Sequence, residues 1–212
     1  MARPRTPLLS RPLIRETALR LVDEHGLDEL SMRKIAAELS VRAPSLYSYY
    51  ANKDELLDDI ADRIGESVDV GGFDTDDWLD ALRRWARSYR AALAEHPNLV
   101  PFLARSPGRR ELALDHANAV HGGLTRCGWP PRTATLIGAS IKYLVVGSAI
   151  ASFSGGFLDD LTIYRERYPH LSQAHRLREH ADEIDRDGFE LALESFLQGL
   201  AQRFASLTGA DR

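Results

Sequence analysis

Apolar residues recur at every third or fourth position along most of the chain, and no useful length alternates apolar and polar positions. The first spacing is typical of amphipathic helices and the second of strands. The pattern therefore predicts an all-α protein. In the first third of the chain it predicts four helices, which begin after Pro12, after Ser31, near Ala43 and after Asn52.

Local signals set these predicted boundaries. Ser31 and Asn52 are residue types that cap helix N-termini, and Gly26 is suited to ending the first helix. Proline is tolerated in a first helical turn, so Pro44 fits the start of the third helix. Leu46 is the apolar anchor of that short helix, with Tyr50 as a second candidate.

The segment "DVGGFDTDD" combines two glycines with several turn-forming residues and predicts a boundary near residues 69–76. We therefore expect an N-terminal domain at 1–68 and a larger helical domain at 69–212. Within the second domain the pattern predicts these helices: long ones at about 76–95, 107–127, 131–152 and 185–206, and shorter ones near 98–105 and 170–182.

Charge divides the chain at a similar place. The first 53 residues carry nine basic and six acidic side chains, a net charge of +3, and the remainder carries −7. A mildly basic head on an acidic body suits a protein whose head approaches nucleic acid. Cys127 is the only cysteine, which excludes an intrachain disulfide and suits a reducing cytoplasm.

Neither a secretory leader nor a membrane span is expected. Prolines interrupt the apolar part of the N-terminus, and Lys142 lies near the middle of the longest apolar segment, "TATLIGASIKYLVVGSAIASF". We interpret that segment as a buried or interface helix and expect a cytoplasmic protein.

Residues 43–53, "APSLYSYYANK", are unusual for a helix because they carry many hydroxyls and few charges. A short polar helix that follows another helix after a tight turn is typical of a helix-turn-helix, whose second helix enters the major groove. Tyrosine and serine hydroxyls and a lysine can donate hydrogen bonds to the flanking phosphates. The pattern therefore favours a DNA-binding head.

The segment "LSMRKIAAELSVRAPSLYSYYANKDELLDDIAD" resembles the DNA-binding domain of the TetR family of bacterial repressors. The resemblance covers roughly residues 12–62 and is nearest to the tetracycline-repressor branch, with a weaker likeness through residues 76–206. It implies an N-terminal three-helix helix-turn-helix domain and a larger helical domain for ligand binding and dimerisation. It also implies a homodimer that binds double-stranded operator DNA and responds to a small-molecule effector.

Carried onto this chain, the resemblance assigns two kinds of DNA contact. Base contacts are implied for Arg33, Arg42, Ala43, Pro44 and Ser45, and phosphate contacts for Tyr47, Ser48, Tyr49 and Lys53. The alternative is that these side chains have structural or solvent-exposed roles. Met32 and Ala43 depart from the tetracycline repressors, which have a threonine and a glutamine there, so we expect a different operator.

Two helices of the body contain small or apolar residues suited to a dimer interface. The resemblance implies that they pair into a four-helix bundle across a two-fold axis. The candidates are Gly138, Gly147, Ala151, Phe189, Leu193, Phe196, Leu197 and Leu200. The alternative is that these residues form an intramolecular core.

Aromatic and polar side chains on the body helices are candidates for the ligand pocket, although core packing is the alternative for each. They are Trp85, Tyr89, Phe102, His116, Asn118, His121, Tyr143 and Phe153. Phe102 aligns with the histidine through which the tetracycline repressor holds a magnesium-bound drug. We therefore expect no magnesium–tetracycline site, no metal and no cofactor.

The sequence favours a ligand-responsive transcriptional regulator, most simply a repressor that a small molecule releases from its operator. The chain has no phosphate loop, dinucleotide-binding glycines, nucleophile elbow or zinc-binding helix motif, so we do not expect an enzyme. The alternative function is a helical small-molecule-binding or scaffold protein without a specific DNA target.

Overall fold

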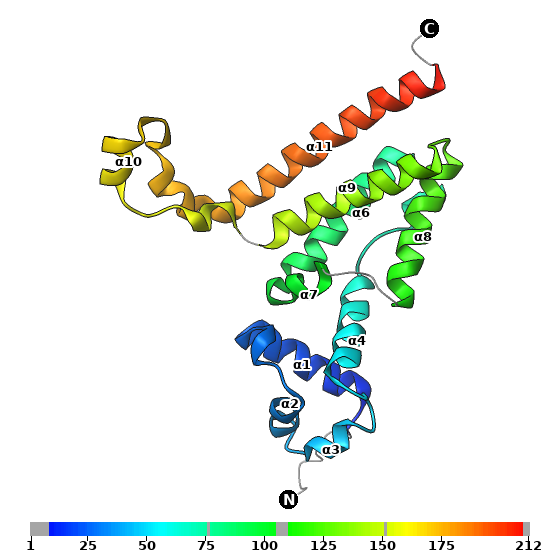
Figure 1. Cartoon of the computed structure of the whole chain (residues 1–212), viewed down its shortest axis with the longest axis vertical. Helices are drawn as coiled ribbons and strands as arrows, with labels where there is room; N and C mark the ends of the chain where they lie inside the picture. Colours follow the sequence, from blue (N-terminus) through cyan, green and yellow to red (C-terminus); the bar gives the residue numbers. More distant parts are fainter. Residues whose placement is uncertain (1–8, 76, 105–109, 151, 210–212) are drawn as a thin grey trace, which may run out of the picture.

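The computed structural model describes residues 9–75, 77–104, 110–150 and 152–209, and its regular elements are all helical in these ranges. The all-α prediction is confirmed. A small head forms one end of the molecule and a larger body the other (Figure 1). The head consists of α1 (Arg11–His25), α2 (Met32–Glu38), α3 (Ala43–Leu46) and α4 (Lys53–Gly65), with a 3₁₀ turn at Leu27–Glu29.

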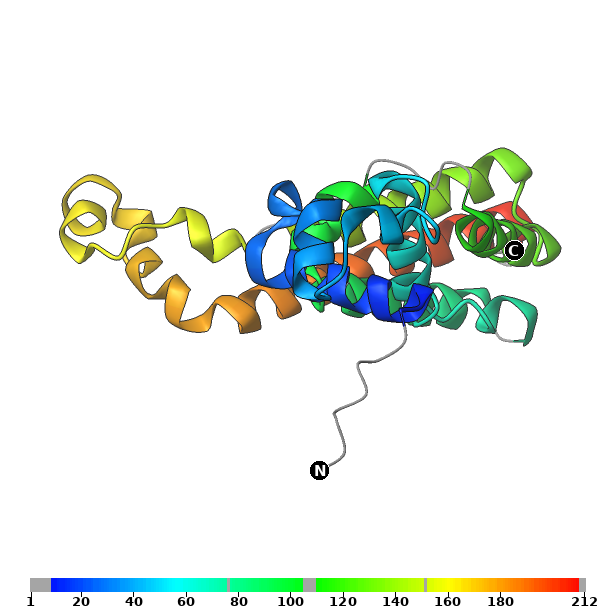
Figure 2. The same ribbon diagram turned by 90° about the horizontal axis from the view of Figure 1, so that it is seen from below.

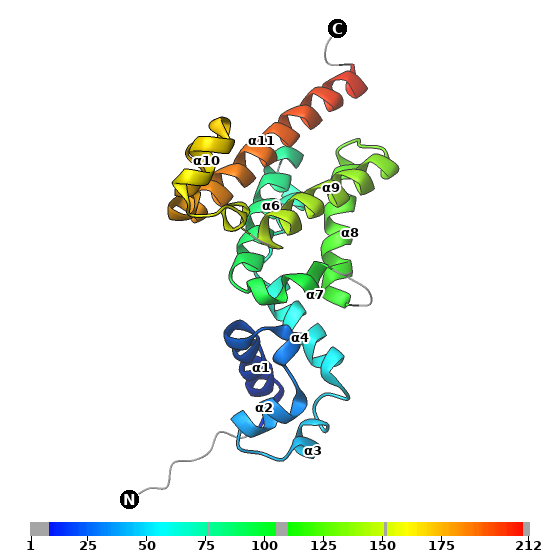
Figure 3. The ribbon, with the colours of Figure 1, turned by 60° about the vertical axis from the view of Figure 1, so that its left-hand side comes forward.

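The body contains seven α-helices within the described ranges. They are α5 (Gly72–Thr75), α6 (Trp78–Ala94), α7 (Val100–Ala104), α8 (Glu111–Arg126), α9 (Pro131–Ile150), α10 (Leu161–Arg167) and α11 (Ala181–Thr208). Helix α9 packs against α6, α7, α8 and α11 and so forms the centre of the body. Figure 3 shows α11 crossing the body beside α6 and α9, with α8 on the other side.

The expected N-caps in the head are confirmed. The Ser31 hydroxyl accepts a hydrogen bond from the Lys34 amide at 3.3 Å, and the Asn52 side chain accepts one from the Glu55 amide at 2.8 Å. Each bond satisfies an amide that has no partner within its helix. These two caps fix where α2 and α4 begin.

Buried apolar side chains from all four head helices form one core. Ile14, Ile35, Leu46, Leu56 and Ile60 are each 0% exposed. Burial of such side chains is the main favourable contribution to folding. The core therefore holds the short helix α3 against the longer helices.

Two ion-pair groups tie α6 to α11 in the body. The Arg83 guanidinium lies 2.7 Å from the Glu194 carboxylate, and that of Arg87 lies 2.6 Å from Glu190. At the distal end of the same helices, Trp78, Trp129 and Phe204 pack with ring centroids 5.0–5.3 Å apart. Charged and aromatic contacts thus hold α11 along the body.

Residues 152–180 form a lobe that projects from one side of the body (Figure 2). The helix expected near 170–182 consists there of two 3₁₀ segments, Pro169–Leu171 and Ala174–His180. Neither α10 in the lobe nor α5 before α6 was predicted, because both are too short for a clear apolar period. The long helices of the body were predicted with boundaries within a few residues of those described, and the part of the helix predicted at 107–109 lies outside the described residues.

The segment expected to separate the two domains is packed rather than extended. Phe73 of α5 is buried, and it lies against the backbone of α8 at Gly123. A Cβ atom at position 123 would lie 2.7 Å from Phe73 Cβ and 2.8 Å from its carbonyl oxygen. Only glycine at position 123 allows this close approach of α5 to α8. The division into domains between residues 68 and 69 stays a prediction.

Gly123→Ala is expected to destabilise the protein by about 1–3 kcal/mol because α5 must move away from α8. Denaturant unfolding followed by tryptophan fluorescence would measure the loss. Gly122→Ala is the matched control, since a Cβ there meets the end of the flexible Arg126 side chain. That control should be neutral or gain up to about 1 kcal/mol from helix propensity. Equal stability of both variants would contradict the close contact.

Candidate DNA-binding surface and ligand cavity

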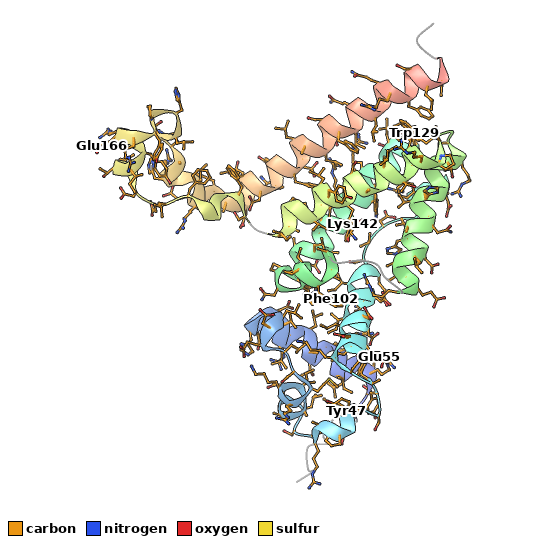
Figure 4. All side chains as sticks on the ribbon, viewed as in Figure 1. Tyr47, Glu55, Phe102, Trp129, Lys142 and Glu166 are labelled. Carbon is orange, nitrogen blue, oxygen red and sulfur yellow. The ribbon has the colours of Figure 1, made fainter. Side chains whose placement is uncertain are left out.

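Most of the side chains predicted to contact DNA are exposed on the head. Those that are exposed are Arg33, Arg42, Pro44, Ser45, Tyr47 and Ser48, while Ala43, Tyr49 and Lys53 are partly buried. Figure 4 places Tyr47 at the end of the head that is furthest from the body. Six of the nine predicted residues are thus accessible, and the individual contacts of all nine with DNA stay predictions.

A tight turn sets the angle between α2 and α3. Ser40 has a φ of 55°, and the Val41 amide donates to the Ala36 carbonyl at 2.9 Å. This conformation ends α2 and redirects the chain into α3. Helix α3 then runs for only one turn, from Ala43 to Leu46.

Tyr50 fixes the end of α3 to the rest of the head. Its ring is 1% exposed, and the Arg11 guanidinium lies 4.3 Å from the ring centroid. Its hydroxyl bonds to the Asp59 carboxylate, which also accepts from Arg15 at 3.3 Å. Burial and the nearby carboxylate raise the pKa of the Tyr50 hydroxyl, so it remains a neutral donor. Tyr50 therefore joins α3 to both α1 and α4.

Two of the predicted phosphate donors also make hydrogen bonds within the head. The Tyr49 hydroxyl donates to the Leu9 carbonyl at 2.9 Å, and the Lys53 ammonium donates to the Leu27 carbonyl at 3.1 Å. Tyr49 uses its single proton in this bond, so a phosphate contact through that proton would require the bond to break. Lys53 keeps two further protons. Tyr47 is half exposed and makes no hydrogen bond within the described residues, so its hydroxyl remains available.

A cavity of about 350 Å³ lies in the body where α4, α6, α8 and α9 meet. Its size is within the range of about 300–1,000 Å³ that is usual for small-molecule sites. Four of the predicted pocket residues line it, namely Trp85, Tyr89, His116 and His121. One wall of this cavity is formed by α4, which is the last helix of the head.

The other four predicted pocket residues do not line the cavity. Tyr143 and Phe153 are 74% and 64% exposed, Asn118 is also exposed, and Phe102 packs partly buried against the core. Tyr143 follows Lys142, and neighbouring helix positions are turned by about 100°, so it points away from the cavity. Aromatic character alone did not indicate which face of each helix encloses the space.

Three charged residues of the cavity wall were missed. The Arg110 guanidinium lies 3.2 Å from the Asp62 carboxylate, and Lys142 reaches the same space from α9. Burial raises the pKa of Asp62 although Arg110 opposes this, and burial lowers the pKa of Lys142, with a further decrease from Arg110. Burial likewise lowers the pKa of His116. The one sequence signal was the lone lysine within the apolar α9 segment.

The predicted dimer residues fall into different environments. Phe189, Leu193, Leu197 and Leu200 are at most 6% exposed, because they pack inside the protomer. This burial fits the alternative of an intramolecular core, and their assignment to the interface stays a prediction. Phe196 is partly buried against the same core, Gly138 lines the cavity, and Gly147 is exposed. Ala151 lies outside the described residues.

Other apolar side chains of α9 and α11 are exposed. On α9 these are Leu136, Tyr143 and Ile150, which are 50–74% exposed and share one face with Gly147. On α11, Leu191 is 72% exposed. We call these five residues the outer face. Of the described helices, α9 is the one with the length and hydropathy of a membrane span, and 22% of its most apolar window is buried in the protomer.

Side chains that commonly bind metals do not cluster in the part of the chain described by the structure. No group of three or more His, Cys, Asp or Glu residues is placed there to hold an ion. His121, one of the cavity histidines, hydrogen-bonds the Pro131 carbonyl at 3.1 Å.

Two family models match almost all of the described chain. Residues 14–65 match the model described as bacterial regulatory proteins of the tetR family, and residues 72–204 match the tetracyclin repressor-like C-terminal domain. An HTH-type transcriptional regulator of Saccharopolyspora erythraea is 30% identical over 145 residues, which cover 68% of this chain and 61% of that protein. The chain thus spans less than two thirds of this relative.

Longer matches extend over both head and body. The class A tetracycline repressor protein from transposon 1721 of Escherichia coli is 32% identical over 209 residues, covering 93% of each chain. The crystal structure of a possible TetR family regulator from Streptomyces coelicolor A3(2) has 30% identity and a TM-score of 0.74. That match covers 91% of this chain and 99% of the other.

Proposed function

Because the chain belongs to the TetR family of bacterial regulatory proteins, we propose that it is a homodimeric repressor that a small molecule releases from operator DNA. The family consists of DNA-binding transcriptional regulators and not of enzymes. The proposal concerns the finer steps, namely which surface binds DNA, which cavity binds the effector and how the two are connected.

Helix α4 is the single feature that best supports this proposal. It begins at Lys53 beside the predicted phosphate contacts, and near its other end Asp62 lines the cavity. A ligand that binds one position of α4 more tightly than another shifts the population of that position. The shift would alter the placement of α3 and hence its fit to the groove.

Two copies are needed for strong and selective binding. A second head doubles the phosphate contacts, and a two-fold dimer fixes the spacing of the recognition helices at about 34 Å or a multiple of it. The outer face of α9 and α11 offers apolar side chains for this pairing. We assign the dimer interface to these exposed residues.

The proposed function can be tested by selecting genomic fragments of the source organism on the purified full-length protein. A regulator should retain a small set of fragments, and its affinity should fall steeply between low and physiological salt because phosphate contacts release counterions. Retention of no fragment would favour the alternative of a small-molecule-binding or scaffold protein. Retention of all fragments equally would exclude a specific operator.

Variants of the head should separate base contacts from phosphate contacts. Arg33→Ala should change which fragments are preferred, because loss of a base contact costs about 1–3 kcal/mol at one position. Tyr47→Phe and Lys53→Ala should instead weaken binding to all retained fragments by similar factors. Competition between the selected fragments and single-base variants would measure both effects. A uniform loss for Arg33→Ala would remove Arg33 from the base-reading residues.

A further inference from the structure

The cavity walls combine extensive apolar surface with an excess of positive charge. Trp85, Leu93, Leu103 and Val120 are among its apolar lining residues. Its charged lining residues in the described structure are Arg110, Lys142 and Asp62, which leave a net charge of +1 when the histidines are neutral. Such a cavity favours an apolar ligand that carries a negative charge.

The two cations differ in how their charges are balanced. Arg110 is 14% exposed and bonds to Asp62 at 3.2 Å, with Asp58 at 3.9 Å. Lys142 is half-buried and forms no ion pair within the described residues, and burial and the charge of Arg110 both lower its pKa. A partly desolvated ammonium is stabilised by any anion that reaches it. Among the described lining residues, Lys142 is therefore the cation without an ion-pair partner.

The aromatic side chains indicate the shape of the ligand. Trp85 and Tyr89 both line the cavity from α6 and stack with ring centroids 6.3 Å apart and an interplanar angle of 22°. Both side chains contribute aromatic surface to the cavity wall. Planar rings gain the most contact with such a surface.

We propose that the effector is an aromatic anion whose acidic group binds between Arg110 and Lys142 and displaces Asp62 from Arg110. This inference rests on the proposed function, because it names the ligand class and the switch contact of the same site. The acidic group is a carboxylate, a sulfonate or an acidic phenol, since each carries a delocalised negative charge that a guanidinium and an ammonium bind together.

Competition for Arg110 would connect ligand binding to the head. Asp62 lies on α4, whereas Arg110 precedes α8 of the body, so their ion pair holds α4 to the body wall. When the ligand takes the guanidinium, Asp62 loses its partner and is repelled by the new anion. Helix α4 is then free to move relative to α8, and the head at its other end moves with it.

Two dyes with the same ring skeleton can test this proposal. Anilinonaphthalene sulfonate is anionic, N-phenylnaphthylamine lacks the sulfonate, and both fluoresce more strongly in apolar sites. With the full-length protein in the absence of DNA, we expect the anionic dye to bind about tenfold more tightly or better, since a charged contact is involved. Equal or tighter binding of the neutral dye, or no saturable binding of the anionic one, would overturn the proposal.

Three variants connect the difference to the named residues. Lys142→Met should lower the affinity for the anionic dye by about tenfold and change the affinity for the neutral dye by no more than about twofold. Asp62→Asn should raise the affinity for the anionic dye by about tenfold, because it removes the carboxylate that competes for Arg110. Lys34→Met, at an exposed position of the head, is the matched control and should change neither affinity. Equal changes for both dyes in the first two variants would mean that these residues act only on folding, which contradicts the proposal.

The outcomes distinguish this inference from the proposed function. A protein that selects an operator but does not discriminate between the dyes keeps the proposed function and loses the ligand class. A protein that discriminates between the dyes but retains no DNA fragment keeps the anion site and loses the repressor assignment. If both hold, the anionic dye should release the selected fragment, and Asp62→Asn should shift the release to lower dye concentrations.

Discussion

Tyr50→Ala is expected to abolish DNA binding while the helices of the body that pack on α9 stay folded. Removing a fully buried aromatic ring costs about 3–5 kcal/mol, and the change also leaves Asp59 without its hydroxyl donor. The head has a small core, and its share of the stability of the whole chain is correspondingly limited. We expect the head to melt separately at low temperature, which circular dichroism and fragment retention would show together.

Tyr50→Phe is the control for this prediction. It keeps the ring beneath Arg11 and loses the hydroxyl contacts with the Asp59 carboxylate and the Arg11 carbonyl, of which the bond to the charged group is worth about 1.5–3 kcal/mol. This variant should retain the selected fragments below its lowered melting temperature. Tyr47→Phe, at an exposed position, should leave the melting temperature unchanged. Unchanged operator affinity in Tyr50→Ala would show that Tyr50 does not hold α3 in place.

The head could be predicted closely from the sequence because its signals are local. Ser31 and Asn52 cap helices through amides three residues ahead, and the turn before α3 is set by adjacent residues. Such contacts depend on spacing along the chain, which the sequence displays. Tyr50 was anticipated as an anchor, whereas its bonds to Asp59 and Arg11 depend on how α1 and α4 pack.

The body could be predicted less well because its decisive contacts join distant segments. Arg110 meets Asp62 across 48 positions, and no local pattern marks either as a cavity residue. The apolar face of α11 was visible, but an apolar period has the same form whether it is buried by the same chain or by a second copy. Phe189 and Leu193, for example, were assigned to an interface and are buried within the protomer. Conversely, the exposed Tyr143 was read as a pocket residue.

A charge on the outer face is expected to disrupt the dimer and so to weaken operator binding. Leu191→Glu should convert the protein to a monomer, because the buried carboxylate would lose its hydration at the centre of an apolar contact. In a dimer, the second head binds DNA as an intramolecular step once the first head is bound. Because a monomer loses this advantage, its affinity for the selected operator should fall by about 10²–10⁴-fold. Light scattering after size exclusion and fragment retention would measure the two changes on one sample.

Leu114→Glu is the matched control, because it places the same charge at an exposed leucine of α8, outside the outer face. It should leave both the dimer and the operator affinity unchanged. Tyr143→Glu, on the neighbouring helix α9, should reproduce the effect of Leu191→Glu if both helices take part in one interface. The monomeric variants should still discriminate between the two dyes, because the cavity walls named above all belong to one protomer. A dimer that persists in both glutamate variants would place the interface elsewhere on the body.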